Sequence, residues 1–290
     1  MGNFYCLMTG LPTISLNETE KALPVASIKE LIEEEEQGTS KADKKIIFTF
    51  FLEGDCRNLL SVLQHPQLDL PQVGNYSREE LEELIESSSD DMFEDDPRFP
   101  AFMPKFIREY NASKDQAGFF AEDALMLSYW EYAQKAKSSL VSEWAKLNLN
   151  ISNLLTALIA RQQNWNISSY IKGENEVNET ILSSKAKDFD LGREYDYVGQ
   201  LMQIVECENP VEKERRIDAL KWLWLDDQTF FDEFNTDAVY AYLCKTQMLE
   251  RWRKLDTAYG KERFETIIEN LRGEAKVPEE FLTSSIKNNR

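Results

Sequence analysis

A regular run of apolar residues most constrains the fold of this 290-residue chain. Between residues 116 and 147, steps of alternately four and three residues give the nine positions Phe119, Asp123, Met126, Trp130, Ala133, Lys137, Leu140, Trp144 and Leu147. Seven of these nine side chains are apolar. This spacing places one apolar stripe along a helix and is typical of helices that pack side by side. We therefore predict one long helix that reaches from about residue 116 to residue 147.

Other segments have the same helical period. They predict helices over residues 27–36, 42–53, 78–86 and 150–163. Three more helices are predicted toward the C-terminus, and their apolar faces consist of Ile217, Leu220, Leu223 and Trp224, of Tyr242, Met248, Leu249, Trp252 and Leu255, and of Phe264, Ile267, Ile268 and Leu271. Asn235 or Thr236 is the predicted cap of the second of these, and Gly273 closes the third. Residues 65–75, 87–104 and 164–180 are rich in Pro, Gly, Asn and Asp and are predicted loops. Residues 4–16 are the one candidate for a short extended segment. The expected fold is an all-α, multi-lobed helical bundle.

The net charge of the chain limits the classes of partner that it can bind. Lys and Arg number 33 against 52 Asp and Glu, so the formal net charge is −19. A field of this sign repels phosphate backbones and anionic lipid heads, so we expect no nucleic-acid partner. The longest apolar runs are far shorter than the roughly 20 residues that a membrane helix needs, so we expect no direct membrane insertion. Four scattered cysteines suit a reducing compartment, which predicts a cytoplasmic protein.

An internal repeat carries more information than the composition. The segment that starts at Asp55 matches the segment that starts at Asn150, at an offset of 95 residues, in the pattern Asx-x-x-Asn-Leu-Leu-small-x-Leu. The second Asn is Asn58 in the first copy and Asn153 in the second. We predict that the Asx residue caps a helix and that the Asn reaches back to the cap. The alternative is that any Asx-capped, leucine-rich helix has this pattern by chance.

This motif resembles that of the C or d central-stalk subunits of V-type and A-type rotary ATPases, in which a helix ends in Asp-x-x-Asn-Leu followed by apolar residues and an Arg. The second copy supplies Asn150, Asn153, Leu154 and Arg161, whereas the first copy has Asp55 and Asn58 but Gln64 near the basic position. The third lobe of that family carries a helix of the type apolar-x-Ala-Tyr-Leu-x-x-Lys, which the stretch VYAYLCK at residues 239–245 resembles, followed by Glu250, Arg251 and Arg253. The opening FYCLMTGLP at residues 4–12 departs from that family. It resembles an uncharacterised bacterial family that is associated with V-type ATPases as a divergent form of the same central-stalk protein.

The resemblance implies a fold and a function. It implies a funnel-like protein of three helical lobes, which we place at residues 1–110, 111–195 and 196–290. It implies a non-catalytic connector that couples the rotor shaft to the membrane ring during proton or sodium transport, and that lies on the cytoplasmic side, peripheral to the inner membrane through the complex. Its partners would be the shaft subunits and the ring. The competing interpretation is a free-standing helical adaptor or regulator, and an enzyme of unknown type is a distant third.

The sequence offers little support for chemistry. A helical di-metal site needs two histidines, whereas this chain has one, His65. No glycine-rich phosphate-binding motif occurs. We therefore expect no catalytic residues, no cofactor and no metal. A Cys56–His65 nucleophile pair is conceivable but strongly disfavoured, because Cys56 occupies a packing position.

One basic group stands out in the acidic chain. It consists of Arg251, Trp252, Arg253 and Lys254. Two interpretations are open: a partner interface, or a helix end that is paired to carboxylates.

Overall fold

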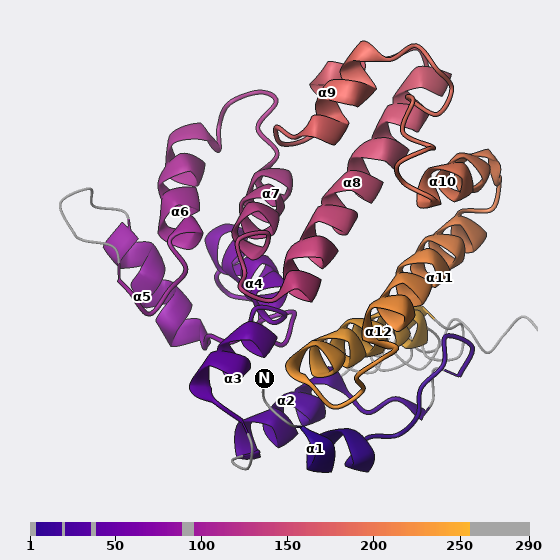
Figure 1. The fold of residues 1–290 in the computed structure, drawn as a ribbon. Helices are drawn as coiled ribbons and strands as arrows, with labels where there is room; N and C mark the ends of the chain where they lie inside the picture. Colours follow the sequence, from indigo (N-terminus) through magenta and orange to yellow (C-terminus); the bar gives the residue numbers. More distant parts are fainter. Residues whose placement is uncertain (1–3, 19–20, 36–38, 89–95, 256–290) are drawn as a thin grey trace, which may run out of the picture.

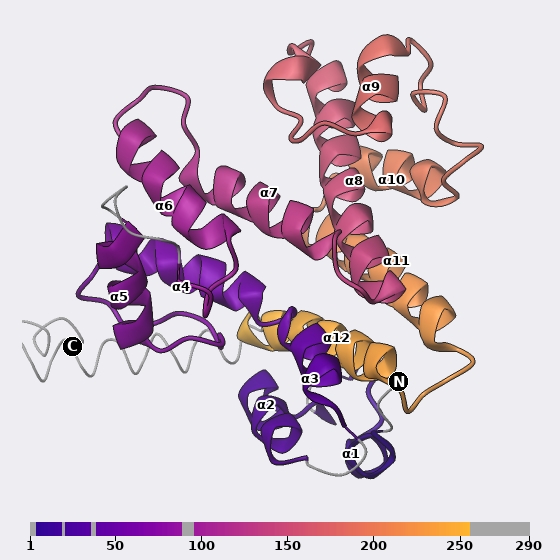
Figure 2. The same ribbon diagram turned by 60° about the vertical axis from the view of Figure 1, so that its left-hand side comes forward.

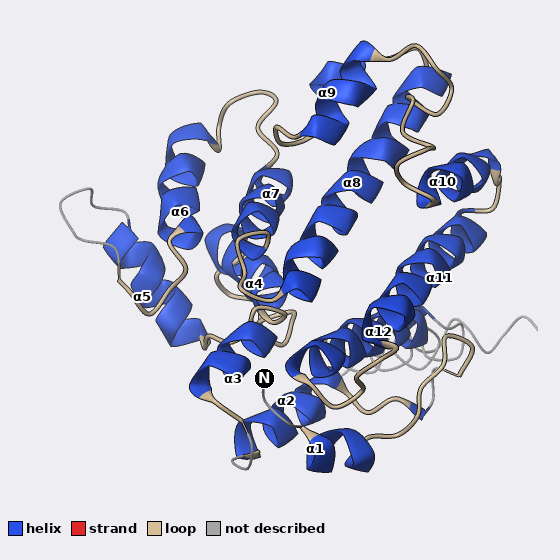
Figure 3. Ribbon diagram, in the orientation of Figure 1, coloured by secondary structure: helices blue, strands red, loops and turns tan. Residues whose placement is uncertain are grey.

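The computed structural model describes residues 4–18, 21–35, 39–88 and 96–255. Within these ranges every regular element is a helix, as Figure 3 shows by its colours. The all-α expectation is confirmed.

The helices lie along the chain in a simple order. They are α1 (Tyr5–Gly10), α2 (Val25–Glu34), α3 (Lys41–Phe48), α4 (Leu52–Gln64), α5 (Arg78–Ser88), α6 (Phe102–Ser113), α7 (Ala121–Ala133), α8 (Ser139–Gln162), the short 3₁₀ helix η2 (Ile167–Ser169), α9 (Glu176–Ser183), α10 (Tyr197–Glu206), α11 (Pro210–Thr229) and α12 (Thr236–Leu255).

Two helical units stand next to each other above the N-terminal helices and α12 (Figures 1 and 2). In the first unit α4 packs on α5 and α7, and α6 packs on the same two helices. In the second unit α8 packs on α9 and α10, and α10 packs on α11. Below them, α12 packs on α2 and α3, which come from the opposite end of the chain.

The apolar interior falls into two clusters. The larger cluster joins the N-terminal helices, α4 to α7 and α12. The smaller cluster lies between the C-terminal half of α8, α9 and α10. Trp144 of α8 and Trp224 of α11 border both clusters, with their ring centroids 5.7 Å apart. This aromatic pair lies where the two clusters meet and packs α8 against α11.

The single helix predicted over residues 116–147 is wrong. The segment is two helices, because α7 ends at Ala133 and α8 begins at Ser139. The Ser138 hydroxyl accepts a hydrogen bond from the backbone N–H of Val141 at 3.1 Å and donates one to Asp237 of α12 at 2.7 Å. Ser138 therefore starts a new helix directly after Lys137, one of the two polar positions of the stripe, and the apolar positions resume at Leu140.

Two further predictions need correction. Residues 150–163 are not a separate helix, since α8 runs through Asn150 without a break. The N-terminal segment is helical rather than extended from Tyr5 to Gly10. This helix forms because Leu7 is buried against the larger core cluster and the backbone N–H of Phe4 donates to the carbonyl of Phe234 at 2.8 Å.

Most other predicted helices are confirmed with shifted ends. The prediction over 42–53 is divided at residues 49–51 between α3 and α4. Helices α6 and α9 begin inside the predicted loops 87–104 and 164–180. Asn235 caps α12, since its side chain accepts from the backbone N–H of Ala238 at 2.8 Å. The predicted helix around residues 264–271 and its closing Gly273 lie outside the described residues.

The expected lobe boundaries fall at different kinds of position. The boundary at residues 110 and 111 lies inside α6, and the boundary at 195 and 196 lies just before α10. The division into three lobes stays a prediction. Among the helices that the structure describes, none is both long and apolar enough to cross a membrane.

Candidate functional site: two asparagine clamps and a hollow

The first copy of the repeat holds a loop against the middle of α4. The side-chain oxygen of Asn58 accepts from the backbone N–H of Gln72 at 3.0 Å, and its side-chain nitrogen donates to the carbonyl of Gln72 at 3.0 Å. Asn58 is fully buried. The amide thus pairs with one loop residue as a second peptide group would. We call this arrangement the first asparagine clamp.

Asp55 reinforces the first clamp one turn earlier on α4. Its carboxylate accepts from the backbone N–H groups of Asn75 at 2.7 Å and Tyr76 at 3.1 Å, and from the Asn75 side chain at 2.7 Å. Burial raises the pKa of Asp55 to about 6, although these hydrogen bonds act in the opposite direction. The carboxylate therefore fixes the start of α5 at an electrostatic cost.

The second copy repeats this geometry on α8. The side-chain oxygen of Asn153 accepts from the backbone N–H of Lys172 at 2.9 Å, and its nitrogen donates to the carbonyl of Lys172 at 2.8 Å. The Asn153 nitrogen also donates to the side-chain oxygen of Asn178 at 3.0 Å, and Asn178 in turn donates to the carbonyls of Lys172 and Gly173, each at 2.8 Å. This is the second asparagine clamp.

The predicted capping role of the motif is wrong. Asp55 and Asn150 do not cap helices, because α4 begins at Leu52 and α8 begins after its own cap, Ser138. A residue in the middle of a helix has its backbone groups satisfied already, which leaves its side chain free to hold another segment. The motif is therefore a loop-binding device on the flank of a helix.

The loop side of the repeat was not predicted from the sequence. Gln72 and Asn75 in the first unit correspond to Lys172 and Asn175 in the second, at an offset of 100 residues instead of 95. The spacing of three residues is kept in both loops, and five extra residues lie between helix motif and loop motif in the second unit. This shared spacing was the signal in the sequence from which the loop partners could have been predicted.

Arg161 lies near the C-terminal end of α8 and holds a different segment. It donates to the backbone carbonyls of Ser184, at 3.2 Å, and Ala186. Its guanidinium carbon lies 3.7 Å from the centre of the Phe189 ring. The arginine of the motif thus fastens the chain that follows α9.

The first unit has its arginine on a different helix, and this arginine holds a different loop. Gln64 ends α4 and borders a surface hollow, whereas Arg78 of α5 donates to the carbonyls of Pro66, at 2.9 Å, and Leu68. Each unit therefore has one arginine that binds loop carbonyls, but Arg161 holds the chain after α9 and Arg78 holds the loop before α5.

A further step of 95 residues from Asn150 and Asn153 reaches Lys245 and Met248 on α12. This helix has no asparagine at the clamp position. Its Glu250 instead accepts from the backbone N–H of Val25 at 2.7 Å, at the first residue of α2. All three helices therefore hold the start of another helix, but α12 holds one from the opposite end of the chain.

The basic group lies at the C-terminal end of α12, next to α11. Arg251 contacts the carboxylates of Asp218, at 2.5 Å, and Glu214, at 3.2 Å, and the Trp252 indole donates to Asp218 at 2.7 Å. For Arg251 and Trp252, the structure therefore supports the second interpretation, a helix end that is paired to carboxylates. Arg253 lies 3.9 Å from Glu250. That Arg253 and the exposed Lys254 also contact a partner stays a prediction.

The disfavoured nucleophile pair does not assemble. Cys56 is buried on α4, where burial raises the pKa of its thiol well above the usual range. His65 is exposed after the end of α4. Over the described part of the chain, no group of three or more His, Cys, Asp or Glu side chains is arranged to hold a metal ion.

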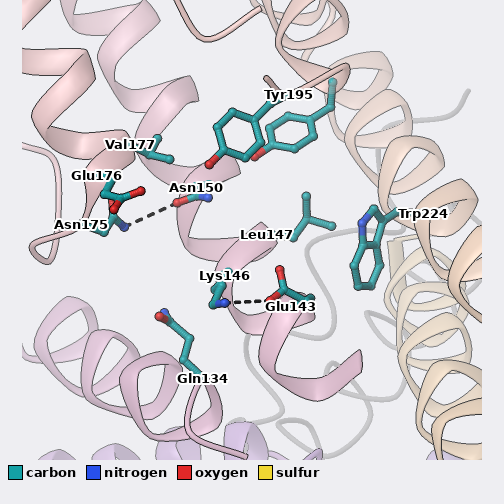
Figure 4. A pocket seen from close by; sticks show the side chains of 11 residues that line it. Gln134, Glu143, Lys146, Leu147, Asn150, Asn175, Glu176, Val177, Tyr195 and Trp224 are labelled. Carbon is teal, nitrogen blue, oxygen red and sulfur yellow. Dashed lines mark hydrogen bonds and ion pairs between the residues drawn. The ribbon is translucent and has the colours of Figure 1, made fainter. Parts of the chain in front are cut away.

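A hollow of about 390 Å³ lies beside the second clamp (Figure 4). It is lined by Gln134, Glu143, Lys146, Leu147, Asn150, Asn175, Glu176, Val177, Tyr195, Tyr197 and Trp224. Tyr195 forms one wall and Trp224 another (Figure 4). The ring of Tyr197 lies next to that of Tyr195, with their centroids 5.5 Å apart. Burial raises the pKa of Tyr197 to about 12, and a hydrogen bond with Asn150 opposes this shift. The hollow was not predicted from the sequence, because its walls come from helices far apart in the chain.

Comparisons with known proteins place the chain in a family. The family model described as "Protein of unknown function (DUF2764)" matches residues 1–275. The chain belongs to this family. The DUF2764 match includes both clamps, the hollow and the basic group. Searches of the curated proteins and of the solved structures found no match to this DUF2764 member.

Proposed function

We propose that this DUF2764 protein is a non-catalytic connector of a V-type or A-type rotary ATPase. In this role it joins the rotor shaft to the membrane ring on the cytoplasmic side, as a counterpart of the C or d protein of the central stalk. The observation that carries the proposal is the pair of asparagine clamps. The residues by which the sequence resembles the central-stalk proteins are the residues that bind loops to helices in both units.

A part that transmits torque must resist bending between its helices. Each clamp joins a helix to the segment before the next helix through two backbone hydrogen bonds in a buried setting. Buried hydrogen bonds of this kind are costly to break, so the helices of a unit move together. The Trp144–Trp224 pair between the two core clusters supports the same role, because close-packed interiors transmit strain.

The proposal is tested by recovery from the native cell. The tagged chain is purified from membranes in mild detergent, the co-purified proteins are identified by mass spectrometry, and ATP hydrolysis is measured in the eluate. We expect shaft and ring subunits together with ATP hydrolysis, and none from the isolated chain. A tagged acidic cytoplasmic protein of similar size is the matched control.

The competing interpretation gives a different result. Recovery of the chain alone, or with proteins unrelated to an ATPase, would favour a free-standing adaptor and would contradict the connector. Hydrolysis of ATP by the isolated chain would contradict both.

A further inference from the structure

The hollow beside the second clamp has the walls of a binding site. Tyr195 lies on one side, Trp224 on another, and Leu147 and Val177 complete the apolar part (Figure 4). Tyr197 also lines the hollow, next to Tyr195. Aromatic faces of this kind attract flat or cationic groups.

The charges around the hollow favour a cation. Glu143 and Glu176 are exposed at its rim, and the one lysine there, Lys146, is already paired to Glu143 at 2.7 Å. Burial, followed by the carboxylates of Glu194, Glu176 and Glu143, raises the pKa of Tyr195. With Lys146 balancing Glu143, the charged residues of the lining sum to one negative charge, that of Glu176, which disfavours an anion.

Asn150 provides a second, independent observation. At the matching position of the first unit, Asp55 accepts three hydrogen bonds at 2.7 to 3.1 Å. Asn150 is only 8% exposed. Its hydrogen bond with Tyr197 lowers the pKa of that tyrosine, so the Asn150 amide nitrogen is the donor there. Among the described residues, its oxygen accepts only from Asn175 at 3.5 Å, the limit of such an interaction. Its amide lines the hollow (Figure 4). A buried acceptor that is so weakly used has capacity for a donor that enters from the hollow.

We propose that this hollow binds a guanidinium cation. A guanidinium is planar, so it stacks on the tyrosine or tryptophan rings, and its five N–H donors reach carboxylate and amide oxygens at the same time. Glu143 and Glu176 supply the carboxylates, and Asn150 supplies the amide oxygen. An ammonium group lacks the flat face and is more strongly hydrated, so it fits less well. The proposal is independent of the rotary ATPase assignment.

The test uses the full chain and methylguanidinium as the probe. The indole N–H signal of Trp224, assigned with a Trp224→Phe variant, is followed by NMR during titration at constant ionic strength. We expect a saturable shift, with methylammonium binding more weakly. We expect Glu176→Gln to weaken methylguanidinium binding about fivefold or more, because it removes one carboxylate at the rim.

The matched control is Glu179→Gln. Glu179 is also in the first turn of α9 and is exposed, but it does not line the hollow. Both variants therefore remove one exposed carboxylate from the first turn of α9. We expect the Glu179→Gln variant to bind the probe as the parent chain does.

The source of the cation is distinguished by two further probes. Binding of N-acetylarginine amide identifies the site as one for an arginine side chain of a partner protein. Binding of free arginine alone identifies it as a small-molecule site. The proposal is overturned if no probe gives a saturable shift, if methylammonium binds as tightly as methylguanidinium, or if the two glutamate variants weaken binding equally.

Discussion

At the scale of single residues, the molecule depends on asparagines in the middle of helices. Asparagine is a modest helix former, because its side chain competes for backbone hydrogen bonds. Asn58 and Asn153 are almost fully buried, and their side chains form hydrogen bonds with the backbone of a loop residue instead of with their own helix. The same hydrogen-bonding groups that weaken an isolated helix here join a helix to a loop in the folded protein.

Replacing a clamp asparagine should destabilise the fold. Asn153→Ala leaves the N–H of Lys172 without its partner and weakens the hold on its carbonyl, so we expect a loss of about 2–4 kcal/mol in the free energy of unfolding. Asn58→Ala should have a similar effect through Gln72. Urea denaturation measures both losses.

Asn148→Ala is the control for the clamp prediction. Asn148 is on the same helix as Asn153, but its side chain donates to the carbonyl of Trp144 within α8. We expect a loss below about 1 kcal/mol. Equal losses for Asn148→Ala and Asn153→Ala would contradict the clamp interpretation.

Asp55 should make stability depend on pH. Its pKa is about 6 in the folded protein, against an ordinary value of 3.8, so the folded state binds more protons between these two values. The contribution of Asp55 is therefore most favourable below pH 4 and falls as the pH rises to 6, by on the order of 3 kcal/mol. Asp55→Asn should remove this dependence.

The measurement for Asp55 compares unfolding free energies of the parent chain and Asp55→Asn from pH 4 to pH 7. The difference between them should change across this window in favour of the variant as the pH rises. Glu131→Gln, which removes an exposed carboxylate on α7, is the control. A parallel pair of curves for the parent and Asp55→Asn would contradict the raised pKa.

At the scale of elements, the close approach of α4 to its loop requires glycine. A Cβ atom on Gly54 would lie 2.1 Å from the carbonyl oxygen of Val73. We therefore expect Gly54→Ala to cost about 2–4 kcal/mol, since one of the two segments must move. Gly199→Ala in α10 has open space around the added atom and should be neutral or stabilising by up to about 1 kcal/mol. Thermal unfolding of the two variants checks the contrast.

The contact between α11 and α12 gives a second test at this scale. Asp218 is only 3% exposed, and its carboxylate forms an ion pair with Arg251 and accepts a hydrogen bond from the Trp252 indole. Arg251→Met should cost on the order of 1–3 kcal/mol, because it leaves a buried carboxylate with fewer partners. Arg253→Met should cost less than about 1 kcal/mol, because its ion pair is long and partly exposed. Urea denaturation distinguishes them, and equal losses would contradict the assigned pairing.

Helices were predictable from the period of their apolar residues, but their ends were not. The apolar positions that end at Ala133 resume at Leu140 after the break before Ser138, because both helices pack into the same core cluster. Lys137 within the stripe and Ser138, which starts α8, were the local signals of the break. Asn150 led to the opposite error, a helix start predicted in the middle of α8, because an Asx residue with apolar residues on both sides resembles a cap.

The candidate site was predictable only on its helix side. The residues Asp55, Asn58, Asn150 and Asn153 stood out as a repeat, whereas their loop partners follow at two different offsets. The hollow depends on how α8, α9 and α11 pack, together with the Tyr195–Tyr197 segment. No short motif encodes such a meeting of distant segments.

At the scale of the whole molecule, acidity should govern association. With a net charge of −19, we expect partners that present basic surfaces and a complex that weakens as salt is added. The measurement is the amount of partner retained by the tagged chain in washes of increasing sodium chloride. Sucrose at matched osmolality is the control and should release none. Retention that does not change with salt would contradict electrostatic association.

The hydrogen bond between Glu250 and Val25 also has a consequence for synthesis. Its two residues are 225 positions apart, and Tyr242 reaches across a similar span to the carbonyl of Pro12. At about 5–20 residues per second, a ribosome makes Glu250 roughly 10 to 45 s after Val25. During that interval α2 has left the ribosome without the helix that covers it, so its apolar face is open to chaperones until α12 emerges.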